Sequence, residues 1–371
     1  MRQSRAYPWL VVFMLWFVCF FNYADRQAIS AVLPKLEDEF HFDKFQQGLI
    51  GSAFMWVYAL GAPFAGLVAD RFRRKDLILG GCLFWSFVTM LTGWCGRLWQ
   101  FVGVRALEGF GETFYFPATM SLVSDYHGGR TRSRALSLHQ SGVYAGTIAG
   151  SWLGAWFAVH WGWRSGFYVF GACGMLLALA LYRFLREPRR GAADRYVHDA
   201  PLPLSQVLPA IFHTPRAVLL MLAFLGANFV ATVFLTWAPT FLKLKFDFDL
   251  PTAGLYATLF IHLASAFGSP TGGWLADVLA KRFAGGRMMV QATGLLVGSV
   301  FVVCVGLTED VPTLLLTMSL FGFCKGLYDS NIFASLYDVV EPRARATAAG
   351  VMNTVGWGGG ALGPLAVGWL A

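Results

Sequence analysis

Charged side chains interrupt two of the apolar stretches of this sequence, where they are able to exchange protons or hold an anion. Asp25 and Arg26 lie in the first stretch, and Arg105, followed by Glu108 and Glu112, lies in the fourth. An ionisable side chain at the centre of a membrane-spanning helix costs roughly 2.5–3.5 kcal/mol, so several retained charges are candidates for function. We therefore expect a site for protons and an anion at these five residues.

The types of these residues suggest their roles. A carboxylate beside an arginine is held ionised, whereas a carboxylate in a dry cavity favours its protonated form, so a change of exposure can load and unload a proton. Asp25 and Glu112 are the proton carriers that we expect. Arg26 and Arg105 would hold a substrate carboxylate, or steady the acidic groups when no substrate is bound. A static structural ion-pair network is the alternative.

Spacing predicts which of these side chains meet. Glu108 and Glu112 follow Arg105 at i+3 and i+7, so all three project from one face of a helix. At 1.5 Å per residue, Asp25 and Arg105 both lie roughly 10 Å below the outer surface, and we expect them to pair across the cavity. Glu108 is either a third proton-coupling group or only neutralises Arg105, and the sequence favours neither.

Membrane-spanning helices are the elements that must position these charges. Of the 371 residues, 56% are hydrophobic and 13% are charged, and the mean hydropathy is +0.54. This composition is typical of a polytopic membrane protein. The predicted fold class is therefore all-α, with eleven spans at 9–32, 46–69, 77–96, 99–124, 135–160, 163–185, 216–242, 252–276, 287–308, 311–338 and 346–371.

Basic residues gather on one side of the predicted spans, and this fixes the orientation. With the N-terminus in the cytoplasm, 20 of the 29 Lys and Arg residues lie on the cytoplasmic side, six face out and three lie within spans. This positive-inside pattern accounts for the net charge of +8 without a nucleic-acid partner. We expect a multi-pass protein in a lipid bilayer, a bacterial-type inner (plasma) membrane, with a cytoplasmic N-terminus.

The chain divides once, and each part carries the same loop. A polar segment at 187–215 separates an N-terminal bundle of six spans, 1–186, from a C-terminal bundle of five, 216–371. The loop 66–75 (GLVADRFRRK) recurs, with its Gly, Ala and Asp, 207 residues later at 273–282 (GWLADVLAKR). An internal repeat of this kind is typical of alternating-access transporters.

These motifs carry a family resemblance. The loop 66–75 closely resembles the signature loop of the major facilitator superfamily, although Arg73 replaces its central glycine. The segment 105–112 (RALEGFGE) resembles the helix-four motif of that family, and 162–164 (GWR) is typical of it too. The resemblance covers essentially the whole chain and implies two six-helix halves. Because the family has twelve helices, we expect the chain to stop before a twelfth.

Three shorter segments resemble one branch of this superfamily, the anion:cation symporters. They are 22–26 (NYADR), 111–117 (GETFYFP) and 237–239 (WAP). The resemblance implies proton-coupled symport of a small organic anion, such as a sugar acid or another carboxylate. Spinster-like transporters, implicated in lipid and lysolipid export, share the first segment and the helix-four motif and rank second. A non-transporting sensor is a further alternative.

Further polar residues within spans are candidates for contact with a small anionic substrate. Lys325 and Asp329 lie at i,i+4, and either neutralise each other or leave Lys325 to attract the anion. In the symporter family, polar residues on helices five and eleven contact substrate, which Gln140 and Asn353 resemble. The full set of substrate-binding candidates is Tyr23, Arg26, Arg105, Gln140, Tyr144, Asn228, Lys325, Asn353 and Trp357.

The repeated loops supply the gating candidates, which are Asp70, Arg71, Arg74 and Asp277. By resemblance, Asp70 would latch the cytoplasmic side against helix eleven, and Asp277 would do so near helix five. We expect Asp70→Ala to remain in the membrane while transport falls, and wild-type uptake rates would contradict this role.

Other classes of chemistry find little support in the sequence. It contains no metalloprotease, phosphate-binding or nucleophile-elbow motif, so we expect neither catalytic residues nor a cofactor, and protons are the expected coupling ion. For the single histidines His139 and His262 we expect packing or a hydrogen bond instead of metal binding, and the six cysteines show no paired spacing. Glycines at every fourth position from Gly142 to Gly154 predict a close helix contact, at an interface between the two halves. We expect a monomer.

Overall fold

The computed structural model describes residues 6–127, 131–188, 209, 211–283, 285–340 and 345–370, in which the regular elements are all helices. A first bundle comprises α1 (Tyr7–Phe40), α2 (Lys44–Arg71), α3 (Arg74–Thr92), α4 (Leu98–Thr113), α5 (Tyr115–Tyr126), α6 (Arg132–Phe157), the π-helical turn η1 (Ala158–Gly162) and α7 (Trp163–Phe184). A second bundle comprises α9 (Pro215–Phe246), α10 (Leu250–Ala280), α11 (Gly286–Leu307), α12 (Val311–Asp329), α13 (Ile332–Val339) and α14 (Arg345–Leu370).

The helices have the length and polarity of membrane spans. Within the described ranges, eight continuous helical stretches are long and apolar enough to cross a membrane, and one of them, 134–184, contains most of α6 and all of α7. Each of the eleven predicted spans coincides with one helix or with two consecutive helices. The prediction of an all-α multi-pass membrane protein is confirmed. The predicted linker lies mostly on residues 189–208, outside the described chain, so the domain boundaries stay predictions.

Local sequence explains where several helices begin. Asp43 caps α2, because its carboxylate accepts from the backbone N–H of Gln46 at 2.7 Å and the Gln46 side chain returns the contact. Asp310 caps α12 by accepting from the backbone N–H of Thr313 at 2.9 Å. That hydrogen bond lowers the pKa of the Asp310 carboxyl below its ordinary value. Such caps set the helix ends that face water.

Two predicted spans are each divided into two helices. The span predicted at 99–124 breaks between α4 and α5 at Phe114, three residues before Pro117. A proline lacks the N–H that would bond to the carbonyl four residues earlier, and its ring crowds that carbonyl. The span predicted at 311–338 breaks after Asp329, where Ser330 and Asn331 side chains donate to the carbonyl of Leu327. The fourth span of each bundle is therefore broken into two helices.

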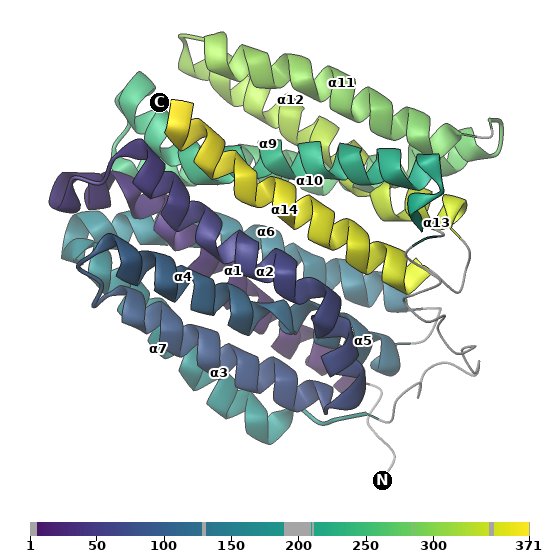
Figure 1. Cartoon of the computed structure of the whole chain (residues 1–371), viewed down its shortest axis with the longest axis horizontal. Coiled ribbons are helices and arrows are strands. Elements are labelled where there is room, and N and C mark those ends of the chain that lie inside the picture. Colours follow the sequence, from purple (N-terminus) through teal and green to yellow (C-terminus); the bar gives the residue numbers. More distant parts are fainter. Residues whose placement is uncertain are drawn as a thin grey trace.

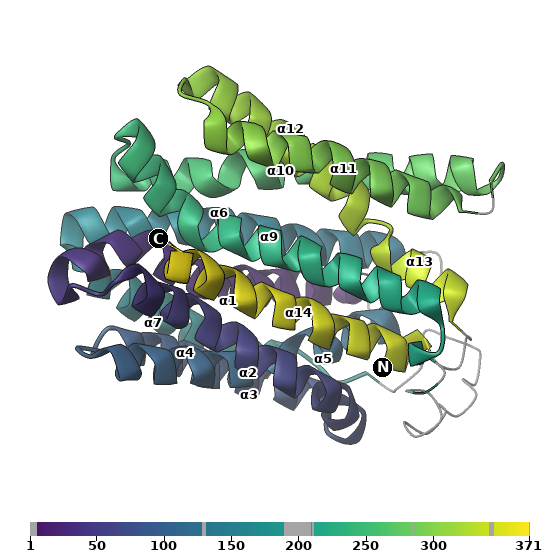
Figure 2. The ribbon, with the colours of Figure 1, turned by 45° about the horizontal axis from the view of Figure 1, so that its top comes forward.

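The bundles lie side by side, with α14 running along both α2 and α9 in two views (Figures 1 and 2). We call the end where α7 stops and α9 starts the linker end, and the opposite end the far end. The apolar cluster around Leu36 at the far end includes Leu250 of the second bundle. At the linker end, by contrast, each apolar cluster of described residues draws on one bundle alone.

Glycines allow backbone contact between the bundles at the far end. A Cβ at Gly48 would lie 2.4 Å from the carbonyl oxygen of Pro364, and one at Gly254 would lie 2.6 Å from that of Ser151. In addition, the Gln27 side chain donates to the carbonyl of Leu235 at 2.6 Å. Together these contacts hold the far end closed.

The glycine stripe of α6 packs differently from its prediction. Cβ atoms at Gly146 and Gly150 would lie 2.3 Å from the carbonyl oxygens of Phe20 and Ala24, both on α1. Close packing is therefore confirmed, but the expected interface between the halves is wrong, because α1 belongs to the same bundle. The stripe brings α1, with its buried charges, against α6.

Candidate functional site

Arg26 lies at the contact between the two bundles. Its Nη2 donates to Oε2 of Glu112 at 2.5 Å, and the two side chains are 11% and 1% exposed. Aromatic ring centroids surround its Cζ at 4.3–5.4 Å, and they belong to Tyr23, Phe54 and Tyr58 of the first bundle and Trp357 of the second. Each such contact contributes roughly 0.5–2 kcal/mol when water is excluded. The guanidinium therefore joins α1, α2 and α4 to α14.

Arg105 pairs with Glu108 on its own helix. The ion pair joins Nη1 to Oε2, and both side chains are almost fully buried. Arg105 also lies over the Phe54 ring, with its Cζ 5.0 Å from the centroid, so this ring contacts both arginines. The expected pair between Asp25 and Arg105 is wrong, because Glu108, one turn along the same helix, reaches the guanidinium first.

Asp25 has no ion-pair partner in the described part of the chain. Its residue is 1% exposed, and both carboxylate oxygens are enclosed without a hydrogen bond. Glu108, Glu112 and Arg105 lie near enough to act on it electrostatically. Thr89 of α3 also lies close to the Asp25 carboxylate, but its hydroxyl donates to the carbonyl of Trp85 at 2.9 Å. An enclosed carboxylate without a partner is costly when charged.

The second bundle places a third ion pair on α12. Lys325 Nζ contacts Oδ2 of Asp329, and these side chains are 25% and 34% exposed, so both reach an open surface. Lys325 also interacts electrostatically with Tyr144 of α6, His262 of α10 and Tyr23 of α1. The α12 pair therefore lies close to the Arg26 site.

Other predicted substrate contacts divide into two groups. The side chains of Gln140, Tyr144 and Asn353 make no hydrogen bond to the described chain, are partly exposed, and do not have enclosed polar atoms. The structure therefore leaves these polar groups accessible instead of enclosing them. Asn228 is different, because its amide donates to the carbonyl of Phe224 at 2.9 Å and lies against Gly356 at the α9–α14 contact.

The gating candidates that are described form ion pairs within their own bundles. Arg74 at the start of α3 pairs with Asp125 of α5. In the second bundle, Arg287 at the start of α11 pairs with Asp338 of α13 at 2.9 Å and with Asp277 at 3.2 Å. The side chains of Asp70 and Arg71 lie outside the described residues, so their predicted latch stays a prediction.

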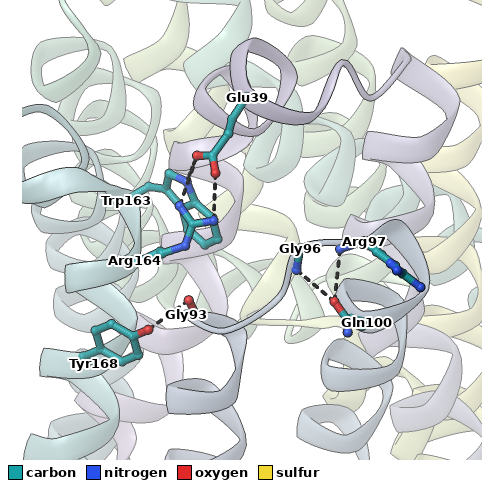
Figure 3. A network of polar contacts seen from close by, with 8 residues as sticks. All are labelled: Glu39, Gly93, Gly96, Arg97, Gln100, Trp163, Arg164 and Tyr168. Carbon is teal, nitrogen blue, oxygen red and sulfur yellow. Dashed lines mark hydrogen bonds and ion pairs between the residues drawn. The ribbon is translucent and has the colours of Figure 1, made fainter.

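A polar network closes the far end of the first bundle. Glu39 at the end of α1 accepts from the Trp163 indole at 2.6 Å and from Arg164 at 2.7 Å (Figure 3). Tyr168 of α7 donates to the carbonyl of Gly93 at 2.9 Å. The GWR segment therefore ties α7 to α1 at some distance from the buried charges.

Three residues of this site were not singled out as cavity residues by the sequence. Phe54 and Tyr58 stack on each other at 5.8 Å and lie over Arg26, and His262 packs on Tyr144 across the bundles at 5.6 Å between ring centroids. The i,i+4 spacing of two aromatic residues in the second span was the available signal. His139 differs, because it is fully buried against the Tyr115 hydroxyl at 2.9 Å.

Three cationic side chains make the arrangement suited to binding a small anion. Each cation of the site is paired with one carboxylate, and Asp25 adds a carboxyl group without a cationic partner among the described residues. In the described part of the chain, no three His, Cys, Asp or Glu side chains lie together as metal ligands.

Fold and site together define a polytopic membrane protein with two helical bundles and charges buried at their contact. The chain belongs to the major facilitator superfamily, since the sequence profile of that family matches residues 15–364. The expected superfamily is thereby confirmed.

Relatives within the superfamily include several anion transporters. The ascorbate transporter, chloroplastic, of Arabidopsis thaliana is 27% identical, over 99% of this chain and 70% of its own length. The probable galactarate/D-glucarate transporter GudP of Bacillus subtilis is also 27% identical, over 99% of this chain and 86% of its own length. Human protein spinster homolog 1 is 35% identical over 63% of this chain. The chain spans only 45% of the length of that relative, and 64% of a probable anion transporter of rice.

Solved structures share the fold. A bacterial homolog of the human lysosomal transporter spinster, in an inward-facing and unoccupied conformation, superposes with a TM-score of 0.86 at 24% identity, covering 99% of this chain and 83% of that one. The nucleoside transporter NupG superposes with a TM-score of 0.76 at 14% identity, covering 97% of this chain and 91% of that one. At these identities the likeness concerns the fold alone.

Proposed function

We propose that this protein is a secondary active transporter that carries a small organic anion, a sugar acid or another carboxylate, together with protons by alternating access. The observation that carries the proposal is the Arg26–Glu112 ion pair at the contact of the two bundles. A substrate carboxylate that binds the Arg26 guanidinium must displace Glu112 from it. The displaced, enclosed carboxylate is stabilised by a proton, so anion binding and proton binding favour each other.

A charge count supports coupling to protons. Three cationic and four acidic side chains form the site, so that it carries one net negative charge when all are ionised: Arg26, Arg105 and Lys325; Asp25, Glu108, Glu112 and Asp329. A proton on Asp25, which lacks a cationic partner, makes the site neutral. An anion then restores a negative charge in a medium of low dielectric constant, and a second proton removes it. We infer at least one proton carried with each anion.

The orientation of the chain in the membrane determines the side to which the site opens. The basic residues favour a cytoplasmic linker end, and the closed far end is then the outer side. This state faces the cytoplasm, which is where a symporter releases anion and protons. The Arg26–Glu112 pair is the arrangement expected after release. The membrane is accordingly proposed to be a bacterial-type inner membrane, with a monomer as the working unit and no cofactor.

Uptake into proteoliposomes tests this function. The purified protein is reconstituted and given gluconate, glucarate or ascorbate with an inside-alkaline pH gradient. We expect accumulation that a protonophore abolishes. Asp25→Asn should still exchange labelled anion for unlabelled anion but concentrate it less than the wild type, because one of the two proposed proton sites is lost and the one on Glu112 remains. Arg26→Gln and Arg105→Ala should lose both activities.

A matched control keeps these results specific. Arg164→Gln removes an arginine from the far-end network of Glu39, away from the buried charges, and should retain uptake. Anion accumulation that ignores the pH gradient would argue against proton coupling. No movement of any anion by the wild-type protein would argue against the proposed substrate class.

Lipid export is the second candidate, favoured by the 35% identity to human protein spinster homolog 1. The same vesicles can be loaded with a fluorescent lysophospholipid. Transport of this lipid, without any anion uptake, would replace the symport proposal.

A further inference from the structure

His262 presents a fixed hydrogen-bond acceptor to the contact between the bundles. Its Nδ1 lies 2.8 Å from the carbonyl oxygen of Thr258, one turn earlier on α10. A carbonyl only accepts, so Nδ1 must carry the proton and, in the neutral ring, Nε2 must be the bare acceptor. That Nε2 has no partner in the described chain and is not enclosed, although the residue is only 8% exposed.

Two neighbouring residues, Tyr144 and Asp329, also have oxygen atoms that can accept a further hydrogen bond. Tyr144 of α6 packs edge-on against His262 with 5.6 Å between ring centroids, and its hydroxyl has no hydrogen-bond partner among the described residues. Asp329 uses Oδ2 for its pair with Lys325, and its Oδ1 is not enclosed. Lys325 interacts electrostatically with Tyr144, His262 and Tyr23, so this group adjoins the Arg26 site.

We propose that His262, Tyr144 and Asp329 form a second subsite, in which Nε2, the phenolic oxygen and Oδ1 accept hydrogen bonds from hydroxyl groups of the transported anion. The inference rests on the proposed function, since the carboxylate of that anion is placed at Arg26. The subsite lies mainly on the second bundle, whereas the carboxylate site lies mainly on the first. A molecule that contacts both therefore has a carboxylate at one end and hydroxyl groups at the other.

The chemistry of the subsite disfavours two other kinds of occupant. An acyl chain cannot donate hydrogen bonds, so it would leave three acceptors without partners and without water, which is costly. A second carboxylate would meet Asp329 as a like charge, so only the Lys325 face could tolerate it. Hydroxyl groups satisfy the acceptors without adding charge.

Matched ligands separate this subsite from the carboxylate site. Gluconate and hexanoate have six carbons and one carboxylate, and glucarate and adipate have six carbons and two; only the first of each pair carries hydroxyl groups. Dissociation constants are measured by titration calorimetry on the full chain in lipid nanodiscs. We expect His262→Leu to weaken gluconate and glucarate about tenfold, the effect of one lost hydrogen bond where the bound ligand excludes water, with hexanoate and adipate unchanged.

Two further variants guard against a merely structural effect. His262→Gln keeps a polar atom near the position of Nε2 and should restore most of the lost affinity. His160→Leu is the matched control, because His160 makes the same contact with the carbonyl four residues earlier, that of Trp156 at 2.9 Å, but lies exposed in η1 at the far end. It should bind all four ligands as the wild type does.

The possible results are distinguishable. The subsite is overturned if His262→Leu prefers the hydroxylated ligand of each pair as strongly as the wild type does. It is also overturned if the variant loses affinity equally for both ligands of a pair. If the subsite is overturned in this way but Arg26→Gln abolishes binding, the carboxylate site at Arg26 is retained without the subsite. Binding that survives Arg26→Gln overturns the carboxylate site, and a wild-type protein that binds none of the four ligands overturns both proposals.

Discussion

Arg26 makes two kinds of contact that a lysine could not make at the same time. Its guanidinium pairs with Glu112 while its flat faces lie against aromatic rings from both bundles. A planar, delocalised cation stacks on rings and still presents donors at its edge, whereas an ammonium group is compact and strongly hydrated. The identity of this residue, and not only its charge, should therefore matter for anion binding.

The first prediction concerns this residue. Arg26→Lys should keep the net charge and the fold but weaken anion binding by about tenfold to a hundredfold, since a bidentate contact and the ring contacts are lost. Calorimetric binding of gluconate measures this. A lysine variant with wild-type affinity would show that charge alone is sufficient.

A second prediction decides the role of the Lys325–Asp329 pair. If the two residues only neutralise each other, the double variant Lys325→Met/Asp329→Leu should transport normally, because no buried charge is left unpaired. If they contact substrate, as we propose, the double variant should lose at least about tenfold in affinity for hydroxylated anions. Uptake with both single variants and the double variant forms a complete cycle.

The sequence predicted which charges gather but not how they pair. Asp25, Arg26, Arg105, Glu108 and Glu112 all lie together, as their spacing in spans one and four indicates. The predicted pair of Asp25 and Arg105 was wrong, because the depth of a residue along the helix axis does not show which face of the helix its side chain occupies or which neighbour is nearest. For His262 the sequence indicated packing or a hydrogen bond but not its neighbour, since no spacing rule shows that a single histidine faces a helix of the other bundle.

At the scale of elements, glycines rather than charges decide how closely the bundles approach at the far end. Gly48 lies near the start of α2, against the carbonyl of Pro364 on α14. The sequence could not predict this contact, because it joins residues more than 300 positions apart and depends on the conformation. The spans themselves were predictable, since each requires about 20 apolar residues.

A third prediction tests this contact. In Gly48→Ala the new Cβ would lie 2.4 Å from a backbone oxygen, so the far end cannot close without displacement. We expect uptake to fall severalfold while thermal stability changes little, because only one of the two conformations is disfavoured. The control is Gly226→Ala on α9, where a Cβ meets nothing within 4 Å. Equal uptake by the two variants would contradict a role in closure.

At the scale of the whole molecule, the contacts between bundles are unevenly distributed. Far-end and central clusters include residues of both bundles, as in the group of Phe54, Tyr58 and Ala361. The linker-end clusters of described residues do not. In the proposed alternating-access cycle, the two bundles would rock about the central site, where Arg26 meets Trp357, and so expose it to either side in turn.

A last prediction locates the open side. Gly350 lies on α14 near the linker end, on the same face as Asn353 and Trp357, and a Cβ there meets nothing within 4 Å. In a cysteine-free background, Gly350→Cys should react with a membrane-impermeant maleimide in inside-out vesicles but not in intact cells. Glu309→Cys, exposed in the far-end loop before α12, should show the reverse pattern. Labelling of Gly350→Cys in intact cells would place the linker end outside, and would reverse both the orientation and the release step proposed for this state.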